Sequence, residues 1–307
     1  MYHRRQPARV VLLGMRCAFT APVLTALAVA PGVAVRAVVL PQGVEAVPEP
    51  ASDAVLDVSR QHGIPLVDIH GRADLATPEF RATLEAIAPD AIVVACFPWR
   101  LPEWLLALPR RGCLNVHPSL LPDGRGPEPV FWAFRWGLAE TGVTVHMMDA
   151  GFDTGPVVGR QRFAIRADAT IPSLERALAR LGADLLIERV PAVLDGSAAA
   201  TAQAGEPARY APIPRVEDLV VPTSWSAAGA ARFIRAVVST YGPIPVLVQA
   251  TGQRLAVAGV RGVDDNTEMA EPVRIRGPEA HIRFSPGLLV CRLAATPRPV
   301  RLHRRSG

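Results

Sequence analysis

Short apolar runs alternate with helical patterns over the first two hundred residues of this 307-residue chain. Apolar, β-branched runs predict six strands, at Val10–Leu13, Val33–Leu40, Pro65–Ile69, Ala91–Cys96, Leu114–His117 and Thr144–Met148. Helical spacing predicts five helices, at Ala21–Ala30, Asp53–His62, Thr77–Ala88, Val130–Leu138 and Ser173–Leu194. Alternation of this kind is typical of an α/β fold with a Rossmann-like, mostly parallel sheet and helices on both faces.

The pattern changes after residue 200. Thr201–Pro214 is rich in Ala, Gly and Pro and lacks periodicity, which indicates a linker. A helix is expected at Ser226–Ser239, followed by short runs that predict strands at Val246–Ala250, Leu255–Val260, Val273–Ile275, Ala280–Phe284 and Leu288–Arg292. The sequence therefore predicts a first domain at 1–200, a linker at 201–214, and a small C-terminal β-barrel (OB-like) or open β-meander at 215–307.

Charge is concentrated in the last third of the chain. All 33 cationic residues are arginine, and the net charge is +5. From Arg215 onward there are 13 Arg and 7 Asp plus Glu, a balance of 13 − 7 = +6, so the rest of the chain is close to neutral. A basic C-terminal region fits a polyanionic partner, and it fits a solvated basic surface equally well.

The chain has no apolar run near the roughly 20 residues that cross a bilayer. Three arginines precede the first apolar run and imitate a signal peptide, but Gly14, Arg16 and Pro22 interrupt that run. We therefore interpret the segment as strand, turn and helix, and we expect a cytoplasmic protein without membrane contact.

The four cysteines are scattered and form no CxxC pair. They are Cys17, Cys96, Cys113 and Cys291. Neither a disulfide framework nor a metal site has this spacing, so we expect buried free thiols and no bound metal.

The side chains best suited to chemistry follow two predicted strands. Asn115 and His117 lie at the end of one strand, and Asp149 and Asp153 lie just past the end of the next. Because ligands bind beyond the carboxyl ends of parallel strands, these residues are expected to meet at one sheet edge. An amide, an imidazole and a carboxylate together suit proton transfer at a carbonyl. Residue types alone leave a structural role equally open, since Asn and Asp also form turns.

No G-x-S-x-G elbow, Walker loop or G-x-G-x-x-G turn is present. The order of residues is more specific. The chain contains Asn115-Val-His117-Pro-Ser119-Leu-Leu-Pro122, then Arg125-Gly126, then Asp149-Ala-Gly-Phe-Asp153-Thr-Gly155. These motifs resemble the folate-dependent formyltransferase family, and most of all its methionyl-tRNA formyltransferases. The resemblance extends from Arg9–Leu24 through Ala88–Pro102 to Tyr210-Ala211-Pro212.

This resemblance implies a formyltransferase fold and an enzyme that moves a formyl group from 10-formyltetrahydrofolate, its co-substrate, to a primary amine. Asn115, His117 and Asp153 would then be catalytic: Asn115 and His117 would stabilise the oxyanion, and Asp153 would hold His117 in its working state. The family's folate-binding run corresponds to Ser119, Leu120, Leu121 and Pro122. The loop with Phe97 and Leu101 and the turn with Asp149 and Gly151 would border the pterin.

The sequence departs from the family at the acceptor side. Methionyl-tRNA formyltransferases carry a basic loop after the second strand, whereas Leu40–Asp53 contains Glu45, Glu49 and Asp53 and no basic residue. Such a loop cannot grip phosphates in the same way. Bulky residues, Phe131 and Trp132, also replace smaller ones in the central motif.

Three functions remain open at this point. Methionyl-tRNA is the leading acceptor, and a small amine such as an aminodeoxy sugar nucleotide is the alternative that the acidic loop and Trp132 motivate. A non-catalytic folate or RNA binder is the third, and the presence of Asn115, His117 and Asp153 argues against it. We expect the chain to act as a monomer.

Overall fold

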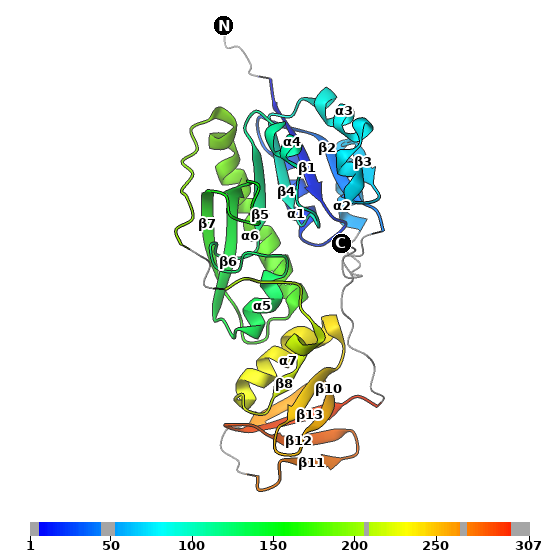
Figure 1. Ribbon diagram of the computed structural model, residues 1–307, viewed down its shortest axis with the longest axis vertical. Helices are drawn as coiled ribbons and strands as arrows, with labels where there is room; N and C mark the ends of the chain where they lie inside the picture. The colour runs from blue at the N-terminus through cyan, green and yellow to red at the C-terminus, as the bar shows by residue number, and fades with distance from the viewer. Residues whose placement is uncertain (1–5, 44–52, 206–208, 265–268, 296–307) are drawn as a thin grey trace.

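The computed structural model describes residues 6–43, 53–205, 209–264 and 269–295, and these residues form two sheets with their helices (Figure 1). The first sheet has seven strands in the order β3-β2-β1-β4-β5-β6-β7. Their bounds are β1 Ala8–Gly14, β2 Val33–Pro41, β3 Leu66–Ile69, β4 Ala91–Ala95, β5 Cys113–His117, β6 Glu140–Met147 and β7 Val157–Ala164. Pairing is parallel from β3 to β5, while β5–β6 and β6–β7 are antiparallel. The expected mostly parallel sheet is confirmed.

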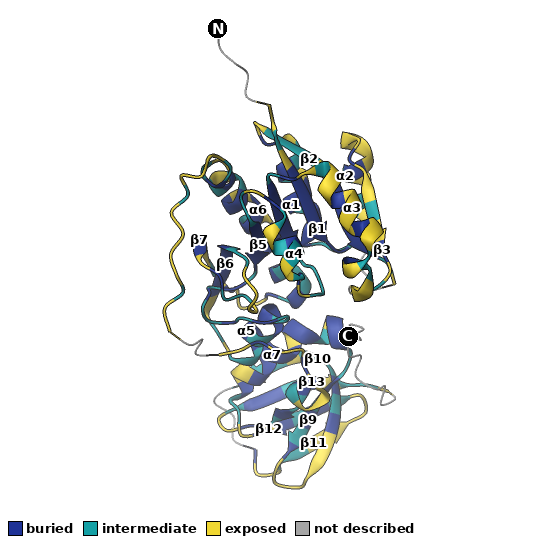
Figure 2. Cartoon of the chain, turned by 45° about the horizontal axis from the view of Figure 1, so that its top comes forward, coloured by how far each residue is buried: buried dark blue, intermediate teal, exposed yellow. Residues whose placement is uncertain are grey.

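Helices cover both faces of the first sheet. Val10 and Leu12 of β1 belong to a core shared with α1 (Thr20–Val29), α2 (Ala54–His62) and α6 (Ile171–Asp195). Val11 and Leu13 alternate with them and pack on the other face against α3 (Pro78–Ile87) and α4 (Glu103–Ala107). Since successive strand residues point to opposite faces, a continuous apolar run is what a strand covered on both sides requires. Figure 2 shows this buried centre between the more exposed helices.

The second sheet has six strands in the order β11-β12-β13-β10-β9-β8. Its strands are β8 Val221–Pro222, β9 Ile244–Val248, β10 Gln253–Asp264, β11 Val273–Arg276, β12 Glu279–Arg283 and β13 Leu288–Leu293. Helix α7 (Ala227–Tyr241) packs on this sheet through apolar residues such as Ala231 and Val237. The pairings among the described residues give an open strand order, so closure into an OB-like barrel stays a prediction.

The two sheets meet through α5 (Pro129–Arg135) and α7. Phe131 of α5 is 1% exposed, and its ring centre lies 5.9 Å from that of Phe233 and 5.5 Å from that of Tyr241, both on α7. One continuous apolar core runs from the first sheet across this contact into the second.

The helix starts and stops agree with the sequence to within a few residues. Thr77 caps α3 as expected, because its side chain accepts a hydrogen bond from the Phe80 amide. The sequence did not predict β7 or α4. Strand β7 lies at the edge of the sheet and carries Arg160, Gln161 and Arg162, all exposed. Polar edge strands lack the apolar alternation that reveals a strand.

Among the helices that the structure describes, none combines the length and the apolar character needed to cross a membrane.

Candidate active site

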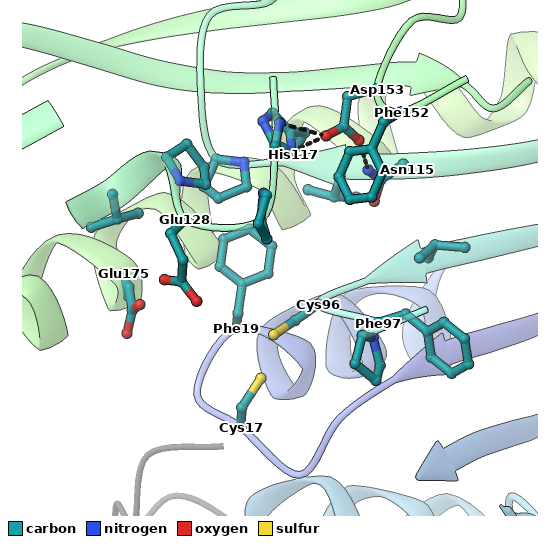
Figure 3. A pocket seen from close by; sticks show the side chains of 18 of the residues that line it. Cys17, Phe19, Cys96, Phe97, Asn115, His117, Glu128, Phe152, Asp153 and Glu175 are labelled. Atoms are coloured by element: carbon teal, nitrogen blue, oxygen red, sulfur yellow. Dashed lines mark hydrogen bonds and ion pairs between the residues drawn. The ribbon is translucent and has the colours of Figure 1, made fainter. Parts of the chain in front are cut away.

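A cavity of about 210 Å³ lies beside the ends of β1, β4 and β5. Its wall is built from the turn after β1, the loop after β4, the end of β5, the turn before α5 and the loop after β6, with contributions from the start of α6 and the end of α7. Figure 3 shows the side chains of this wall, with Asn115, His117 and Asp153 gathered at one end.

Asn115, His117 and Asp153 are in contact in the structure. The Asn115 side-chain amide donates to Asp153 Oδ1 at 3.1 Å, and His117 Nδ1 lies 3.7 Å from Asp153 Oδ2. All three line the cavity. The side chains of His117 and Asp153 are only 6% and 10% exposed, so their charges interact with little screening by water.

His117 is held from both ring nitrogens. Its Nε2 lies 2.9 Å from the Gly124 carbonyl oxygen, which can only accept, so Nε2 carries a hydrogen. Its Nδ1 faces the Asp153 carboxylate, a second acceptor. Burial lowers the pKa of His117, while the Asp153 charge and the Gly124 carbonyl act to raise it. The net effect is a lowered pKa for His117, so the neutral ring is favoured near pH 7 and a proton on Nδ1 depends on the Asp153 carboxylate.

Asp153 is the anionic centre of the cluster. Burial acts to raise its pKa, but the imidazoles of His117 and His146 and the Gly126 amide outweigh burial and bring the pKa to about 2. Its Oδ2 accepts the Gly126 N–H at 3.0 Å. Its backbone has a φ of 55°, a left-handed conformation that Asp adopts more readily than most residues.

The route by which these residues converge differs from the expected one. Strand β6 runs antiparallel to β5, and Asn115 of β5 pairs with His146 of β6. The two strands therefore end at opposite edges of the sheet. The loop after β6 therefore begins beside the start of β5. It folds back before β7 and brings Asp153 next to Asn115. Gln203 fixes this loop by donating to the carbonyls of Asp153 and Gly155, each at 2.8 Å.

His146 belongs to the cluster, although the sequence motifs did not point to it. Its Nε2 lies 3.2 Å from the Asn115 amide nitrogen and 3.6 Å from Asp153 Oδ1, and its Nδ1 lies 2.8 Å from the Met147 carbonyl oxygen. Since that carbonyl accepts from Nδ1, Nε2 is able to accept from Asn115. The signal was a histidine inside an otherwise apolar strand, because a buried imidazole needs polar partners.

The expected folate-binding residues divide into two groups. Phe97, Leu101, Asp149 and Gly151 line the cavity. Asp149 shapes its turn through Oδ1, which accepts the Gly151 amide at 2.9 Å and the Thr154 hydroxyl at 2.6 Å.

Ser119, Leu120, Leu121 and Pro122 are not among the described residues that line the cavity. They form a turn behind His117. Ser119 donates its hydroxyl to the Asp123 carbonyl at 2.8 Å, and the buried Leu121 amide donates to Thr144 Oγ1 at 3.1 Å. This turn presents the Gly124 carbonyl to His117, and contact of residues 119–122 with folate stays a prediction.

Part of the expected linker packs against the site. The Ala211 amide donates to the Arg125 carbonyl at 2.7 Å, and the Glu128 amide donates to the Ala211 carbonyl. The Trp132 indole donates to the Pro212 carbonyl at 2.7 Å. The segment therefore braces the turn that carries Gly126. The acidic loop expected to replace the family's basic loop falls mainly on 44–52, outside the described residues.

No group of three or more His, Cys, Asp or Glu side chains in the described part of the chain could hold a metal ion.

A family model described as "Formyl transferase" matches residues 39–190. The chain is 43% identical over 159 residues to a methionyl-tRNA formyltransferase of Myxococcus xanthus, covering 52% of this chain and 50% of that protein. It is 36% identical over 236 residues to a methionyl-tRNA formyltransferase of Aromatoleum aromaticum, covering 77% of this chain and 68% of that protein. The aligned region thus spans only about half of the Myxococcus relative.

The fold is also similar to that of an N-formyltransferase from Helicobacter canadensis, solved in complex with folinic acid and dTDP-3-aminofucose. The TM-score is 0.66 at 14% identity, covering 92% of this chain and 98% of that one. At this identity the likeness concerns the fold alone. The sequence matches to the methionyl-tRNA formyltransferases show the family: the chain belongs to the formyltransferases.

Proposed function

We propose that the chain transfers a formyl group from 10-formyltetrahydrofolate to a primary amine, with methionyl-tRNA as the leading acceptor. The observation that carries the proposal is the buried cluster of Asn115, His117 and Asp153 at one end of the cavity. An amide, an imidazole and an ionised carboxylate in contact are the groups that acyl transfer to an amine needs.

In the proposed reaction the amine nitrogen forms a bond to the formyl carbon, and the bond from that carbon to N10 of the folate breaks. One proton leaves the amine, and N10 gains one, so no net charge is created. His117 would donate to the developing oxyanion after one ring N–H exchanges its present acceptor, the Gly124 carbonyl or the Asp153 carboxylate. Asp153 would stabilise the imidazolium. Because the pKa of Asp153 is about 2, its carboxylate is ionised throughout the neutral range.

Asn115 must change partners to act on the oxyanion. In the structure its amide nitrogen faces two acceptors, Asp153 Oδ1 at 3.1 Å and His146 Nε2 at 3.2 Å. A primary amide has two N–H bonds, so both are engaged. Donation to a substrate oxygen requires one of these hydrogen bonds to be exchanged when the formyl group enters.

The apolar part of the cavity suits the donor. Phe97 and Trp99 meet edge to face with ring centres 5.6 Å apart, and Leu101 lies beside them in the wall. Planar ligands gain affinity from such aromatic and aliphatic surfaces, and a few polar groups fix their orientation. We infer that the pterin occupies this side, next to the turn of Asp149 and Gly151.

Two observations bear on the acceptor. The sequence relatives named as methionyl-tRNA formyltransferases and the balance of +6 from Arg215 onward support a nucleic-acid acceptor. Glu128 in the cavity wall and the indole of Trp132 beside it favour a small amine such as an aminodeoxy sugar nucleotide. We propose methionyl-tRNA first, because the chain is 43% identical over 159 residues to one relative of that name.

Further parts of the proposal concern the whole chain. The second sheet would form an OB-like barrel that carries the tRNA contact, with domain limits near 200 and 215. We also propose that the chain acts as a monomer in the cytoplasm, where charged tRNA and reduced folates occur.

The acceptor is tested by incubating the purified chain with 10-formyltetrahydrofolate and either charged initiator tRNA or a panel of aminosugar nucleotides. Formylmethionine on the tRNA, with tRNA binding that weakens as salt rises, is the expected result. Formylation of a sugar nucleotide without formylation of tRNA would move the function to the small-amine class. Absence of turnover with every acceptor would favour the third function, a non-catalytic folate or RNA binder.

The chemistry is tested by Asn115→Ala and His117→Ala. Each is expected to lower kcat by roughly a hundredfold or more, the usual loss when an oxyanion donor or general acid is removed. Unchanged far-ultraviolet circular dichroism controls for folding. Full activity in either variant contradicts the mechanism.

A further inference from the structure

Two cysteines face each other in the cavity wall. Cys17 lies in the turn between β1 and α1, and Cys96 directly follows β4. Both line the cavity, and both are partly exposed, so the expected burial is wrong for this pair. Figure 3 shows their side chains pointing toward one another, between Phe19 and Phe97. The proposed transfer reaction uses neither thiol.

The backbone fixes this proximity. Strands β1 and β4 pair in parallel, with Gly14 level with Ala95, so the two chains leave the sheet side by side. The Thr20 hydroxyl donates to the Ala95 carbonyl at 2.9 Å, and Cys17 Sγ lies 3.4 Å from the same hydroxyl oxygen. A Cβ on Gly14 would lie 2.4 Å from the Thr20 side chain, so only glycine permits so close a turn. The two thiols are therefore held together by the fold and do not depend on a ligand.

The surroundings also favour a reactive Cys17. A hydrogen bond with Cys96 is the largest influence on the pKa of Cys17. Burial opposes it, and hydrogen bonds from Thr20 and Phe19 support it, so the pKa falls to about 6. Cys113 and Cys291 are different: they are buried, and burial raises the pKa of each to about 12. The thiolate is the nucleophilic form, so Cys17 is the activated thiol, whereas Cys113 and Cys291 are inert.

We propose that Cys17 and Cys96 form a reversible thiol–disulfide site that reacts with hydroperoxides in the wall of the cavity. The Cys17 sulfur attacks one peroxide oxygen, the O–O bond breaks, and a sulfenic acid and one molecule of water (or alcohol) result. The Cys96 sulfur then attacks the Cys17 sulfur, the S–O bond breaks, and a second water leaves. Two thiol protons and the two peroxide oxygens leave as water or alcohol, and the peroxide is the oxidant. A dithiol reductant reverses the step by thiol–disulfide exchange.

The disulfide would reshape the cavity. Sulfurs in a disulfide are about 2.05 Å apart, closer than any contact between two thiols, so the two side chains must move and we expect the Cys17 turn and the Cys96 loop to shift with them. Phe19 follows Cys17 and Phe97 follows Cys96 in the chain, and both side chains line the cavity. This consequence rests on the proposed function, because it assigns the Phe97 side of the cavity to the folate. Oxidation is then expected to weaken folate binding.

The disulfide is tested on the full chain without any substrate. The reduced protein is treated with one equivalent of hydrogen peroxide at neutral pH, alkylated with iodoacetamide, digested and mapped by mass spectrometry. The expected product is one intramolecular link between Cys17 and Cys96, with a mass loss of about 2 Da. Cys113 and Cys291 should be alkylated only after unfolding. If Cys17 and Cys96 both stay unlinked, or link to other cysteines or other chains, the proposal is wrong.

Variants separate the two thiols. Cys96→Ser should stop at a sulfenic acid on Cys17, which dimedone traps, and Cys17→Ser should give no link and no trapped acid. Cys291→Ala, a matched change far from the cavity, should leave the link unchanged. Equal trapping in Cys96→Ser and Cys17→Ser would overturn the assignment of Cys17 as the attacking thiol. Mapping of the unmodified chain keeps the test decisive if a variant fails to fold.

The consequence is tested by calorimetric binding of 5-formyltetrahydrofolate to the reduced, oxidised and re-reduced chain. Oxidation is expected to raise Kd by roughly fivefold or more, about 1 kcal/mol, with recovery after dithiothreitol. Equal affinities of the oxidised and reduced forms would overturn the reshaping of the cavity. Absence of binding to the reduced chain, with the link still formed, would count against the proposed function and leave the thiol site standing.

Discussion

Asp153 carries more of the site than any other single residue. It accepts from Asn115 and Gly126 and faces the rings of His117 and His146. Its left-handed φ of 55° directs the carboxylate back toward β5. Removal of the charge therefore affects every other member of the cluster at once.

Asp153→Asn tests the charge with the shape retained, since Asn tolerates the left-handed conformation well. We expect kcat to fall by roughly a hundredfold, because the imidazolium of His117 loses its counter-charge. Stability should change in a specific pH window. The folded pKa of about 2 lies below the ordinary 3.8, so the carboxylate stabilises the fold at pH values above 3.8. That contribution, about 2 kcal/mol, is lost as pH falls toward 2, with roughly half gone by pH 3.

Denaturant unfolding between neutral pH and pH 3 measures this contribution. The free energy difference between the parent chain and Asp153→Asn should shrink on acidification. A difference that stays constant across this range would show that the pKa of Asp153 is not lowered in the fold.

His146 makes a second prediction at the residue scale. With its Nδ1 facing the Met147 carbonyl, its Nε2 can accept one N–H of Asn115 and so orient that amide before substrate enters. His146→Leu should lower kcat by roughly tenfold, whereas His146→Gln, which retains an acceptor near Nε2, should recover part of the loss. Steady-state kinetics with matched melting temperatures measure this. Equal kcat losses in the two variants would indicate that the imidazole matters for packing alone.

At the scale of elements, the turn between β5 and α5 holds the cluster together. Gly126 has a φ of 121°, and a Cβ there would lie 2.5 Å from the Ala211 carbonyl oxygen. Its amide is also the backbone donor to Asp153. Glycine is therefore required both for the conformation and for the close approach of the 209–212 segment.

Gly126→Ala should destabilise the fold by about 2 kcal/mol and lower kcat together, because the amide is displaced from Asp153. Gly137→Ala is a matched control: Gly137 follows α5 with a φ of 68°, and a Cβ there would have no neighbour within 4 Å. Gly137→Ala should lower the free energy of unfolding by a similar or smaller amount and leave kcat unchanged. Thermal melting and steady-state kinetics on both variants measure these effects. A normal kcat in Gly126→Ala would show that catalysis does not depend on the conformation of this turn.

How far the sequence predicts these elements depends on burial. Strands such as β4, covered on both faces, are visible as apolar runs, whereas the edge strand β7 with its exposed Arg160 and Arg162 is not. Asn115, His117 and Asp153 were predicted from their residue types at strand ends and from the order of the motifs, whereas periodicity gave no information on strand direction. The antiparallel course of β6, and with it the place of His146, depends on the loop that folds back after Met147. Only the tertiary structure shows that contact.

At the scale of the whole molecule, part of the segment expected to be a linker belongs to the contact between the two sheets. We call this contact, formed by the 209–212 stretch, α5 and α7, the seam. The 209–212 stretch pairs with the turn of Gly126, and α5 packs on α7 with one continuous core beneath. Composition predicts an interdomain linker there, and its 209–212 part makes backbone hydrogen bonds with Arg125 and Glu128. The cavity is completed by Thr240 and Tyr241 from α7, so the position of the second sheet bears on the site.

Arg135 tests whether the seam holds the two sheets together. Its guanidinium lies 4.4 Å from the ring centre of Trp225 and 5.4 Å from that of Phe233, and it donates to the Val220 carbonyl at 3.2 Å. Arg135→Ala removes a cation–π contact and a hydrogen bond across the seam, at a cost of about 2 kcal/mol. The 209–215 segment should then open more often, and trypsin should cut it faster at Arg209 and Arg215.

Arg81→Ala is the control for that change, because Arg81 makes a similar contact with Trp104 at 5.4 Å but within the first sheet and its helices. It should leave cleavage at Arg209 and Arg215 unchanged. Limited trypsin digestion under native conditions, with mass spectrometry of the fragments, measures both variants. Equal cleavage of Arg135→Ala and the parent chain would show that apolar packing of Phe131 on Phe233 holds the seam without the guanidinium. Faster cleavage accompanied by loss of activity would show that the second sheet must stay docked for the cavity to work.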